Sequence, residues 1–395
     1  MTAVKTFHST LPFLLENGQS LPAIDIAYHT WGECAPDDSN VIWVCHALTG
    51  NSDVMDWWAG LFGPGCLFDP ERYFIVCPNN LGSCYGTAGP LSVNPATGTP
   101  YYHDFPAIAI RDMANAHELL RQHLGIRNIH LLIGGSQGGQ QALEWAIQKP
   151  ELIENLALLA TNAVHSPWGI AFNESQRLAI ATDPSWPRHA PDAGLEGMKT
   201  ARSIALLSYR HYHTYGRSQH TTDNGQTDHF PAASYQRYQG EKLARRFNAF
   251  SYWTLSKAMD SHNVGRGRAS VETALASVQA RTMVVSISSD LLFPPEEQEF
   301  LARHIPGAVY ASIDSHYGHD GFLTETAALG RLLGAFMEGR ENNEIWQGAV
   351  SSASSLLSRK ENMQSSTSAS HRSDAFRAWP RRETGSIVCN RFRAE

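Results

Sequence analysis

The stretch that decides the fold is Ile129-His130-Leu131-Leu132-Ile133-Gly134-Gly135-Ser136-Gln137-Gly138-Gly139. It opens with an apolar run of strand length, and the following segment, from Gln140 to Lys149, has helical periodicity and stops at Pro150. Between strand and helix lies the pattern G-x-S-x-G, whose glycines permit a sharp turn that exposes the serine. The helix N-terminus behind the turn favours developing negative charge. We therefore predict that Ser136 is a nucleophile, not a solvated serine in a glycine-rich turn.

Apolar runs and helical segments alternate on both sides of this stretch. Strands are predicted at residues 24–29, 41–45, 73–77, 156–160, 283–287 and 308–313. Helices are predicted at residues 105–124 and 322–337. This alternation is typical of a mostly parallel sheet flanked by helices, so the chain is predicted to be an α/β protein.

The alternation is interrupted between residues 166 and 278. Helical periodicity without a convincing core strand appears there over residues 172–181, 194–209 and 235–258. We interpret residues 166–278 as a helical lid inserted between two parts of the core, residues 1–165 and 279–340. In the last segment, 341–395, eleven of 55 residues are serine and few are apolar, which predicts a disordered tail.

A serine hydroxyl needs a base to remove its proton, and the base needs an acid that orients it. Asp290 directly follows the predicted strand 283–287, and His319 lies between the last strand and the last helix. The order serine, acid, histidine along the chain is that of the α/β-hydrolases. We therefore predict Asp290 as the orienting acid and His319 as the base, with His316 as the competing base. Cys84 is an alternative nucleophile, but we interpret it as an inert loop cysteine.

The oxyanion that forms during acyl transfer needs two aligned N–H donors. The sequence His46-Ala47-Leu48-Thr49-Gly50 leaves the predicted strand 41–45 as a loop. In α/β-hydrolases the corresponding loop supplies one backbone donor, and the residue after the nucleophile supplies the other. The backbone N–H groups of Leu48 and Gln137 are the predicted donors. An ordinary exit from a strand is the alternative for the loop.

Six stretches, in order within residues 20–337, share a more specific pattern. They are H-A-L-T-G (46–50), N-L-G-S-C through G-P (80–90), the turn and helix from Gly134 to Trp145, S-H-N-V-G-R-G-R (261–268), S-D (289–290) and Y-G-H-D-G-F-L (317–323). Together they resemble the homoserine O-acetyltransferase family of the α/β-hydrolase superfamily. The resemblance implies an α/β-hydrolase fold and transfer of an acyl group from acyl-CoA to the side-chain hydroxyl of L-homoserine, in methionine biosynthesis.

The resemblance also implies residue roles. Ser136, Asp290 and His319 match the family's nucleophile, acid and base, and Arg202 and Asp320 match its substrate-binding positions. An arginine suits the acceptor's carboxylate and an aspartate its ammonium. The alternatives are a surface arginine for Arg202 and a helix cap for Asp320.

The chain departs from the family pattern at four positions. Gln137 and Gln140 replace methionines that are usual in the nucleophile turn, and Ser83 and Tyr85 differ from the commonest glycine-loop version. These changes leave open a succinyl-CoA donor or a serine acceptor. An esterase or thioesterase would use the same machinery with water as acceptor, and a non-catalytic binding module is a further alternative.

Composition excludes several other classes. The net charge of −7 gives no indication of nucleic acid or an anionic membrane as partner, and no apolar run is long enough to span a bilayer. The six cysteines lack the spacing of a zinc site or a disulfide framework, so we predict no metal. We expect a cytoplasmic homodimer with no bound cofactor and with acetyl-CoA as the acyl-donor substrate.

Overall fold

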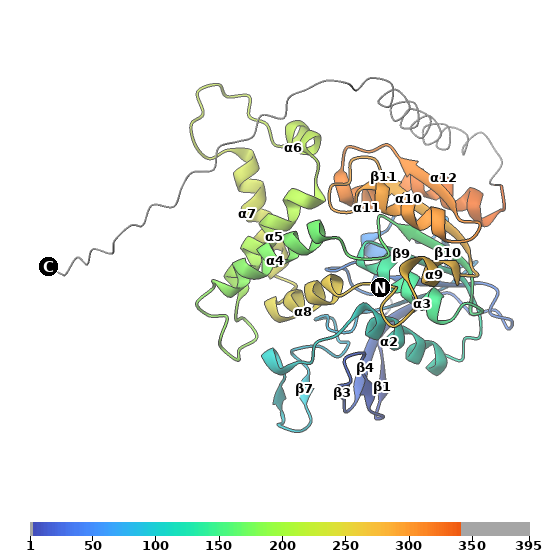
Figure 1. The fold of residues 1–395 in the computed structure, drawn as a ribbon. Coiled ribbons are helices and arrows are strands. Elements are labelled where there is room, and N and C mark those ends of the chain that lie inside the picture. Colours follow the sequence, from blue (N-terminus) through green and yellow to red (C-terminus); the bar gives the residue numbers. More distant parts are fainter. Residues whose placement is uncertain (1–2, 341–395) are drawn as a thin grey trace, which may run out of the picture. The chain divides into compact units, whose positions relative to one another are not determined.

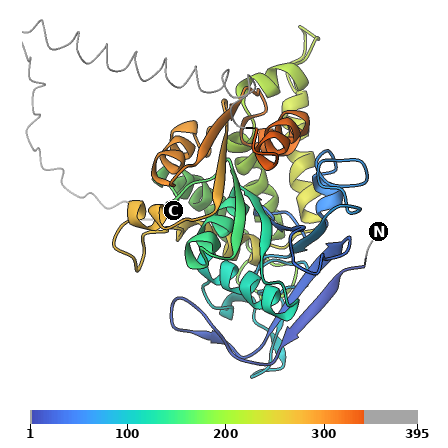
Figure 2. The ribbon, with the colours of Figure 1, turned by 90° about the vertical axis from the view of Figure 1, so that its right-hand side faces the viewer.

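The computed structural model describes residues 3–340, whose centre is an eight-stranded sheet (Figure 1). In sheet order its strands are β1 (Lys5–Ser9), β4 (Ile24–Trp31), β6 (Phe74–Pro78), β5 (Val41–Cys45), β9 (Ile129–Gly135), β10 (Ile153–Leu159), β11 (Arg281–Ile287) and β12 (Val309–Ile313). The strands from β6 to β12 are parallel, whereas β1 and β4 form an antiparallel edge, drawn in blue in Figure 2. The predicted mostly parallel α/β sheet is confirmed.

The sheet is buried on both faces, as its apolar strands require. In β5, Val41, Trp43 and Cys45 join one hydrophobic cluster, while Ile42 and Val44 join a second cluster on the opposite face. Successive side chains of a strand point to opposite faces, so a strand covered on both sides must be apolar throughout. Helices α2 (Ile110–His123), α3 (Gln137–Gln148) and α10 (Pro295–His304) contribute to the first cluster, and α1 (Val54–Trp57), α11 (Gly321–Thr324) and α12 (Thr326–Met337) to the second.

Most of the remaining helices occur between β10 and β11 in the chain. They are α4 (Pro167–Ala181), α5 (Leu195–Tyr209), α6 (Tyr212–Ser218), α7 (Pro231–Ala244), α8 (Ala249–Asp260) and α9 (Val271–Ala276). Figure 1 shows α4, α5, α7 and α8 packed together beside the sheet. Two small hairpins complete the described part, β2 (Phe13–Leu14) with β3 (Ser20–Leu21) and β7 (Val93–Asn94) with β8 (Thr99–Pro100).

Several predicted helices differ from the structure. The helix predicted from residue 172 already begins at Pro167, where Ser166 caps it. The helix predicted from residue 105 begins at Ile110, because Phe105 is extended before Pro106 and Asp112 accepts a hydrogen bond from the N–H of Ala109 at the true start. The segment 235–258 is two helices, separated where Asn248 caps α8. The last predicted helix is likewise divided, between α11 and α12. The prediction of a disordered tail at 341–395 lies outside the described residues.

Parallel strands place the predicted catalytic residues at one edge of the sheet. Ser136 follows β9, Asp290 follows β11 and His319 follows β12. The carboxyl ends of parallel strands meet at the same edge, where ligands bind in open α/β sheets. None of the described helices combines the length and the apolar character that a membrane crossing requires.

Candidate active site

Ser136 sits on a strained turn between β9 and α3. Its backbone has φ 56° and ψ −127°, a conformation that a residue with a side chain rarely adopts. The turn is tight because a Cβ at Gly134 would collide with the carbonyl of Gly138, and a Cβ at Gly138 would collide with the carbonyl of Cys45. Only glycine fits at either place, which is the physical reason for the glycines on both sides of the serine.

Asp290 and His319 form a buried pair. The Nδ1 atom of His319 lies 2.7 Å from Oδ2 of Asp290, and the two side chains are 4% and 0% exposed. The other carboxylate oxygen, Oδ1, accepts the backbone N–H groups of Leu292 and Phe293 at 2.8 and 2.9 Å. These hydrogen bonds fix the orientation of the Asp290 carboxylate, and the carboxylate in turn orients the His319 ring. A proton on Nδ1 leaves Nε2 of the neutral imidazole as an acceptor, which is the tautomer that a general base needs.

Burial and charge act on His319 in opposite directions. Burial lowers the pKa of the imidazole, but the charge and hydrogen bond of Asp290 raise it, and the net pKa of His319 is above its ordinary value. The ring is stacked on Phe293, with centroids 5.0 Å apart. It also lies 5.3 Å from the ring of Phe322, which packs against Gly135, the neighbour of Ser136. Phe322 thus lies against both the His319 ring and the residue before Ser136. Among the described residues, no hydrogen bond joins Ser136 to His319, whose Nδ1 is paired with Asp290.

The two competing residues occupy different surroundings. His316 offers its carbonyl to the Thr214 hydroxyl and places its ring against Tyr317, at 4.3 Å between centroids. Among residues 3–340 it has no carboxylate partner. The Cys84 thiol donates to the carbonyl of Arg246, and burial raises its pKa to about 11, so the reactive thiolate is scarce near neutral pH.

The predicted oxyanion donors are available for a ligand. Neither the Leu48 nor the Gln137 backbone N–H has an acceptor within the described residues. The loop that carries Leu48 is fixed by His46, whose Nδ1 pairs with the Ala47 carbonyl at 2.9 Å and whose Nε2 accepts the Asn80 N–H at 3.0 Å. Burial lowers the pKa of His46 to about 4, so this histidine is neutral and acts as a structural brace.

The two glutamines that depart from the family pattern are buried and hydrogen-bonded. Gln137 Nε2 donates to the carbonyl of Leu255 on α8 at 3.0 Å, which links the start of α3 to the helices between β10 and β11. Gln140 Nε2 donates to Asn162 Oδ1 at 2.9 Å. A methionine side chain could donate neither hydrogen bond. In this chain the two glutamines therefore connect α3 to Leu255 and to Asn162 through hydrogen bonds.

Arg202 and Asp320 lie near the histidine, on different elements. The Arg202 guanidinium, on α5, stands over the Tyr209 ring at 5.3 Å, and that ring is 5.8 Å from the His319 ring. Asp320 follows His319 directly, and its Oδ2 is 2.9 Å from Arg210 Nε. Its side chain makes no capping bond at the start of α11, so the cap alternative for Asp320 is not supported.

Three residues of this site were missed from the sequence. Tyr209 is the last residue of α5 and Arg210 follows it, and nothing in the sequence distinguishes the two from the residues around them. Glu297, on α10, belongs to no recognisable motif. Its Oε2 accepts a hydrogen bond from Asn162 Nδ2 at 2.9 Å, and its carboxyl group is close enough to Asp290 and His319 to interact with both electrostatically. Burial raises the pKa of Glu297 to about 7. The only feature of the sequence that links Glu297 to the site is its position seven residues after Asp290.

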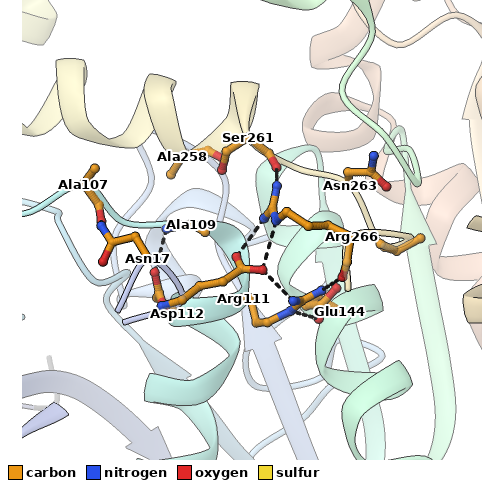
Figure 3. Close-up of polar contacts among 12 residues, drawn as sticks. Asn17, Ala107, Ala109, Arg111, Asp112, Glu144, Ala258, Ser261, Asn263 and Arg266 are labelled. Carbon is orange, nitrogen blue, oxygen red and sulfur yellow. Dashed lines mark hydrogen bonds and ion pairs between the residues drawn. The ribbon is translucent and has the colours of Figure 1, made fainter. Parts of the chain in front are cut away.

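The motif at residues 261–268 has a structural role. Arg266 donates a hydrogen bond to the Glu16 carboxylate at 2.7 Å. Figure 3 shows Arg111 facing Glu144, which lies on helix α3. Glu144 also accepts from Arg268 at 2.6 Å, and its side chain is only 3% exposed. We call the five side chains Glu16, Arg111, Glu144, Arg266 and Arg268 the ion-pair network. It joins the segment after α8 to helices α2 and α3.

No group of three or more histidine, cysteine or acidic side chains in residues 3–340 is arranged to hold a metal ion.

Comparison with known proteins identifies the family to which the chain belongs. A profile of the alpha/beta hydrolase fold matches residues 40–326, so the chain is an α/β-hydrolase-fold protein. The homoserine O-acetyltransferase of Cyclobacterium marinum is 49% identical over 329 residues, which cover 83% of this chain and 93% of that protein. That of Chlorobaculum tepidum is 47% identical over 337 residues, covering 84% and 93%. The chain belongs to the homoserine O-acetyltransferase family and is an enzyme of the transferase class.

Solved structures give the same fold. The crystal structure of homoserine O-acetyltransferase from Bacillus anthracis is similar with a TM-score of 0.78 and 25% identity, over 87% of this chain and 99% of that one. The L374D mutant of esterase E22 is similar with the same TM-score, at 23% identity over 85% of this chain and 100% of that chain. Because an esterase shares the fold, the fold alone does not separate transfer from hydrolysis.

Proposed function

We propose that this enzyme transfers an acetyl group from acetyl-CoA to the side-chain hydroxyl of L-homoserine, in methionine biosynthesis, by double displacement. The observation that carries the mechanism is the buried Asp290–His319 pair at the same sheet edge as the strained Ser136. The proposed substrates are supported by relatives at 42–49% identity, each named homoserine O-acetyltransferase.

In the first step Ser136 Oγ attacks the thioester carbonyl while His319 Nε2 takes the hydroxyl proton. The Leu48 and Gln137 N–H groups stabilise the oxyanion of the tetrahedral intermediate. The C–S bond then breaks, the CoA sulfur leaves with the proton from His319, and Ser136 remains as an acetyl ester.

In the second step the homoserine hydroxyl gives its proton to His319 and attacks the ester carbonyl. The bond to Ser136 breaks, Ser136 Oγ regains the proton, and O-acetylhomoserine leaves. Arg202 suits the acceptor's carboxylate and Asp320 its ammonium, which would aim the third polar group, the hydroxyl, at the ester.

Hydrolysis is the second candidate, because esterase E22 shares the fold. The two are separated by measuring CoA release from acetyl-CoA with and without homoserine. Transfer predicts a burst of about one CoA per active site without acceptor and sustained turnover with homoserine. Sustained CoA release that homoserine does not accelerate would indicate a thioesterase. Repeating the assay with succinyl-CoA, and with serine, identifies the donor and the acceptor.

A further inference from the structure

Two buried polar atoms near Asp320 have no hydrogen-bond partner among the described residues. They are the hydroxyl of Tyr215, on α6, and Nε of Arg210, just after α5. Arg210 Nε is close to Asp320, but its N–H does not point along the 2.9 Å separation, so the contact is an ion pair without a hydrogen bond. Folded proteins rarely keep buried polar groups unpaired, and such groups call for an explanation.

The segment that joins α5 to α6 packs directly against the loop that carries His316, Gly318 and His319. Gly318 has φ 67°, and a Cβ there would be 2.9 Å from the Tyr209 carbonyl oxygen and 3.0 Å from the His211 nitrogen. The hydroxyl of Thr214 donates to the carbonyl of His316 on the same loop. Tyr215 is therefore the next residue after a point where α6 is anchored beside His319.

The charges around the Tyr215 hydroxyl are those of the acceptor site. Burial, followed by the neighbouring Tyr235 phenol, raises the pKa of Tyr215 to about 12, while Arg210 and Arg202 act to lower it and Asp320 to raise it. The phenol thus stays protonated and is available as a donor. Arg202 and Arg210 both act on this phenol, and arginines are the usual partners of a carboxylate, so a carboxylate suits the place of the missing partner.

We propose that the Tyr215 hydroxyl donates a hydrogen bond to the carboxylate of the acceptor amino acid, alongside Arg202, while Arg210 holds Asp320 in place beside it. This assignment rests on the proposed function and deepens it. It makes α6 a part of the acceptor site, so that an alcohol without a carboxylate lacks the contact. The lid would then select amino-acid acceptors through a residue of its own.

The test is Tyr215→Phe, which removes only the hydroxyl and keeps the ring packed on Tyr235. Tyr238→Phe, on the exposed face of α7, is the matched control, since its side chain is 54% exposed. Tyr215→Phe should raise the KM for L-homoserine roughly ten- to hundredfold, as expected for a lost hydrogen bond to a charged group. The CoA burst without acceptor should be unchanged. With L-homoserinol, which lacks the carboxylate, wild type and Tyr215→Phe should have equal KM values.

Three results would overturn the assignment. They are an unchanged KM for homoserine, an equal rise in KM for homoserine and homoserinol, and loss of the burst in Tyr215→Phe. The second and third would show that the hydroxyl serves packing or acylation. A failure of the proposed function is recognised separately, because wild-type enzyme itself would then release CoA without transferring the acyl group to homoserine.

Discussion

His319 and His316 stand three residues apart on one loop, but only His319 is buried against a carboxylate. His319→Ala removes the predicted base and should lower kcat/KM by at least about 10³-fold. His316→Ala should lower it less than about tenfold, because the loop is held through the His316 backbone carbonyl. Steady-state assays of both purified variants test this, and an active His319→Ala with a dead His316→Ala would contradict the assignment.

The Asp290–His319 pair also predicts a pH dependence. The base must be neutral, so kcat/KM should rise with pH through a pKa above the ordinary 6.5 of histidine. Asp290→Asn removes the charge that raises this pKa and leaves the burial that lowers it. The rising limb should therefore move to lower pH, while the maximal rate falls because the ring loses its orienting partner. A pH–rate profile whose limb stays in place would show that another group controls it.

Ser136, Asp290 and His319 could be proposed as nucleophile, acid and base from the sequence because each follows a strand, in the order typical of the fold. Tyr209, Arg210 and Glu297 could not, because their importance comes from contacts between segments far apart in the chain. Arg210 and Asp320 form an ion pair although they are 110 residues apart in the sequence, and no local sequence pattern predicts such a contact.

Helix α3 directly follows Ser136, the proposed nucleophile, and is held by the ion-pair network. Glu144→Gln would leave Arg111 and Arg268 without their buried carboxylate, at a cost of about 3 kcal/mol. The midpoint of thermal unfolding should fall by several degrees. Asp192→Asn is the control, because its pair with Arg188 is 3.8 Å long and exposed, and such pairs contribute about 0–1 kcal/mol. Equal midpoints for Glu144→Gln and wild type would show that the network is not stabilising.

The strands of the central sheet other than β1 were predicted near their observed positions, because strands buried on both faces have a strong apolar signature. Boundaries failed where a local hydrogen bond decides them. The cap at Asn248, which accepts the Ser251 N–H at 2.8 Å, divides an otherwise continuous helical pattern. Helix α6 was missed because its seven residues are polar and aromatic and none of them is buried.

The composition of the segment after Arg340 predicts how the protein behaves when this segment is removed. Its serine-rich composition offers little apolar area for burial. Deleting residues 341–395 should leave kcat/KM and the midpoint of thermal unfolding nearly unchanged. A midpoint lowered by more than about 5 °C would indicate that the segment stabilises the rest of the protein.

The expected homodimer stays a prediction. Sedimentation of the 395-residue chain and of the chain without residues 341–395 would test it.

The proposed double-displacement mechanism depends most on one covalent intermediate. Enzyme mixed with acetyl-CoA in the absence of acceptor, quenched in acid and digested, should yield the peptide containing Ser136 with one acetyl group attached by an ester. Adding L-homoserine before the quench should remove that group and release O-acetylhomoserine. Peptide mass spectrometry gives both results. An acetyl group on Cys84 instead, or turnover with no acetyl group on Ser136 at any time, would contradict the central claim.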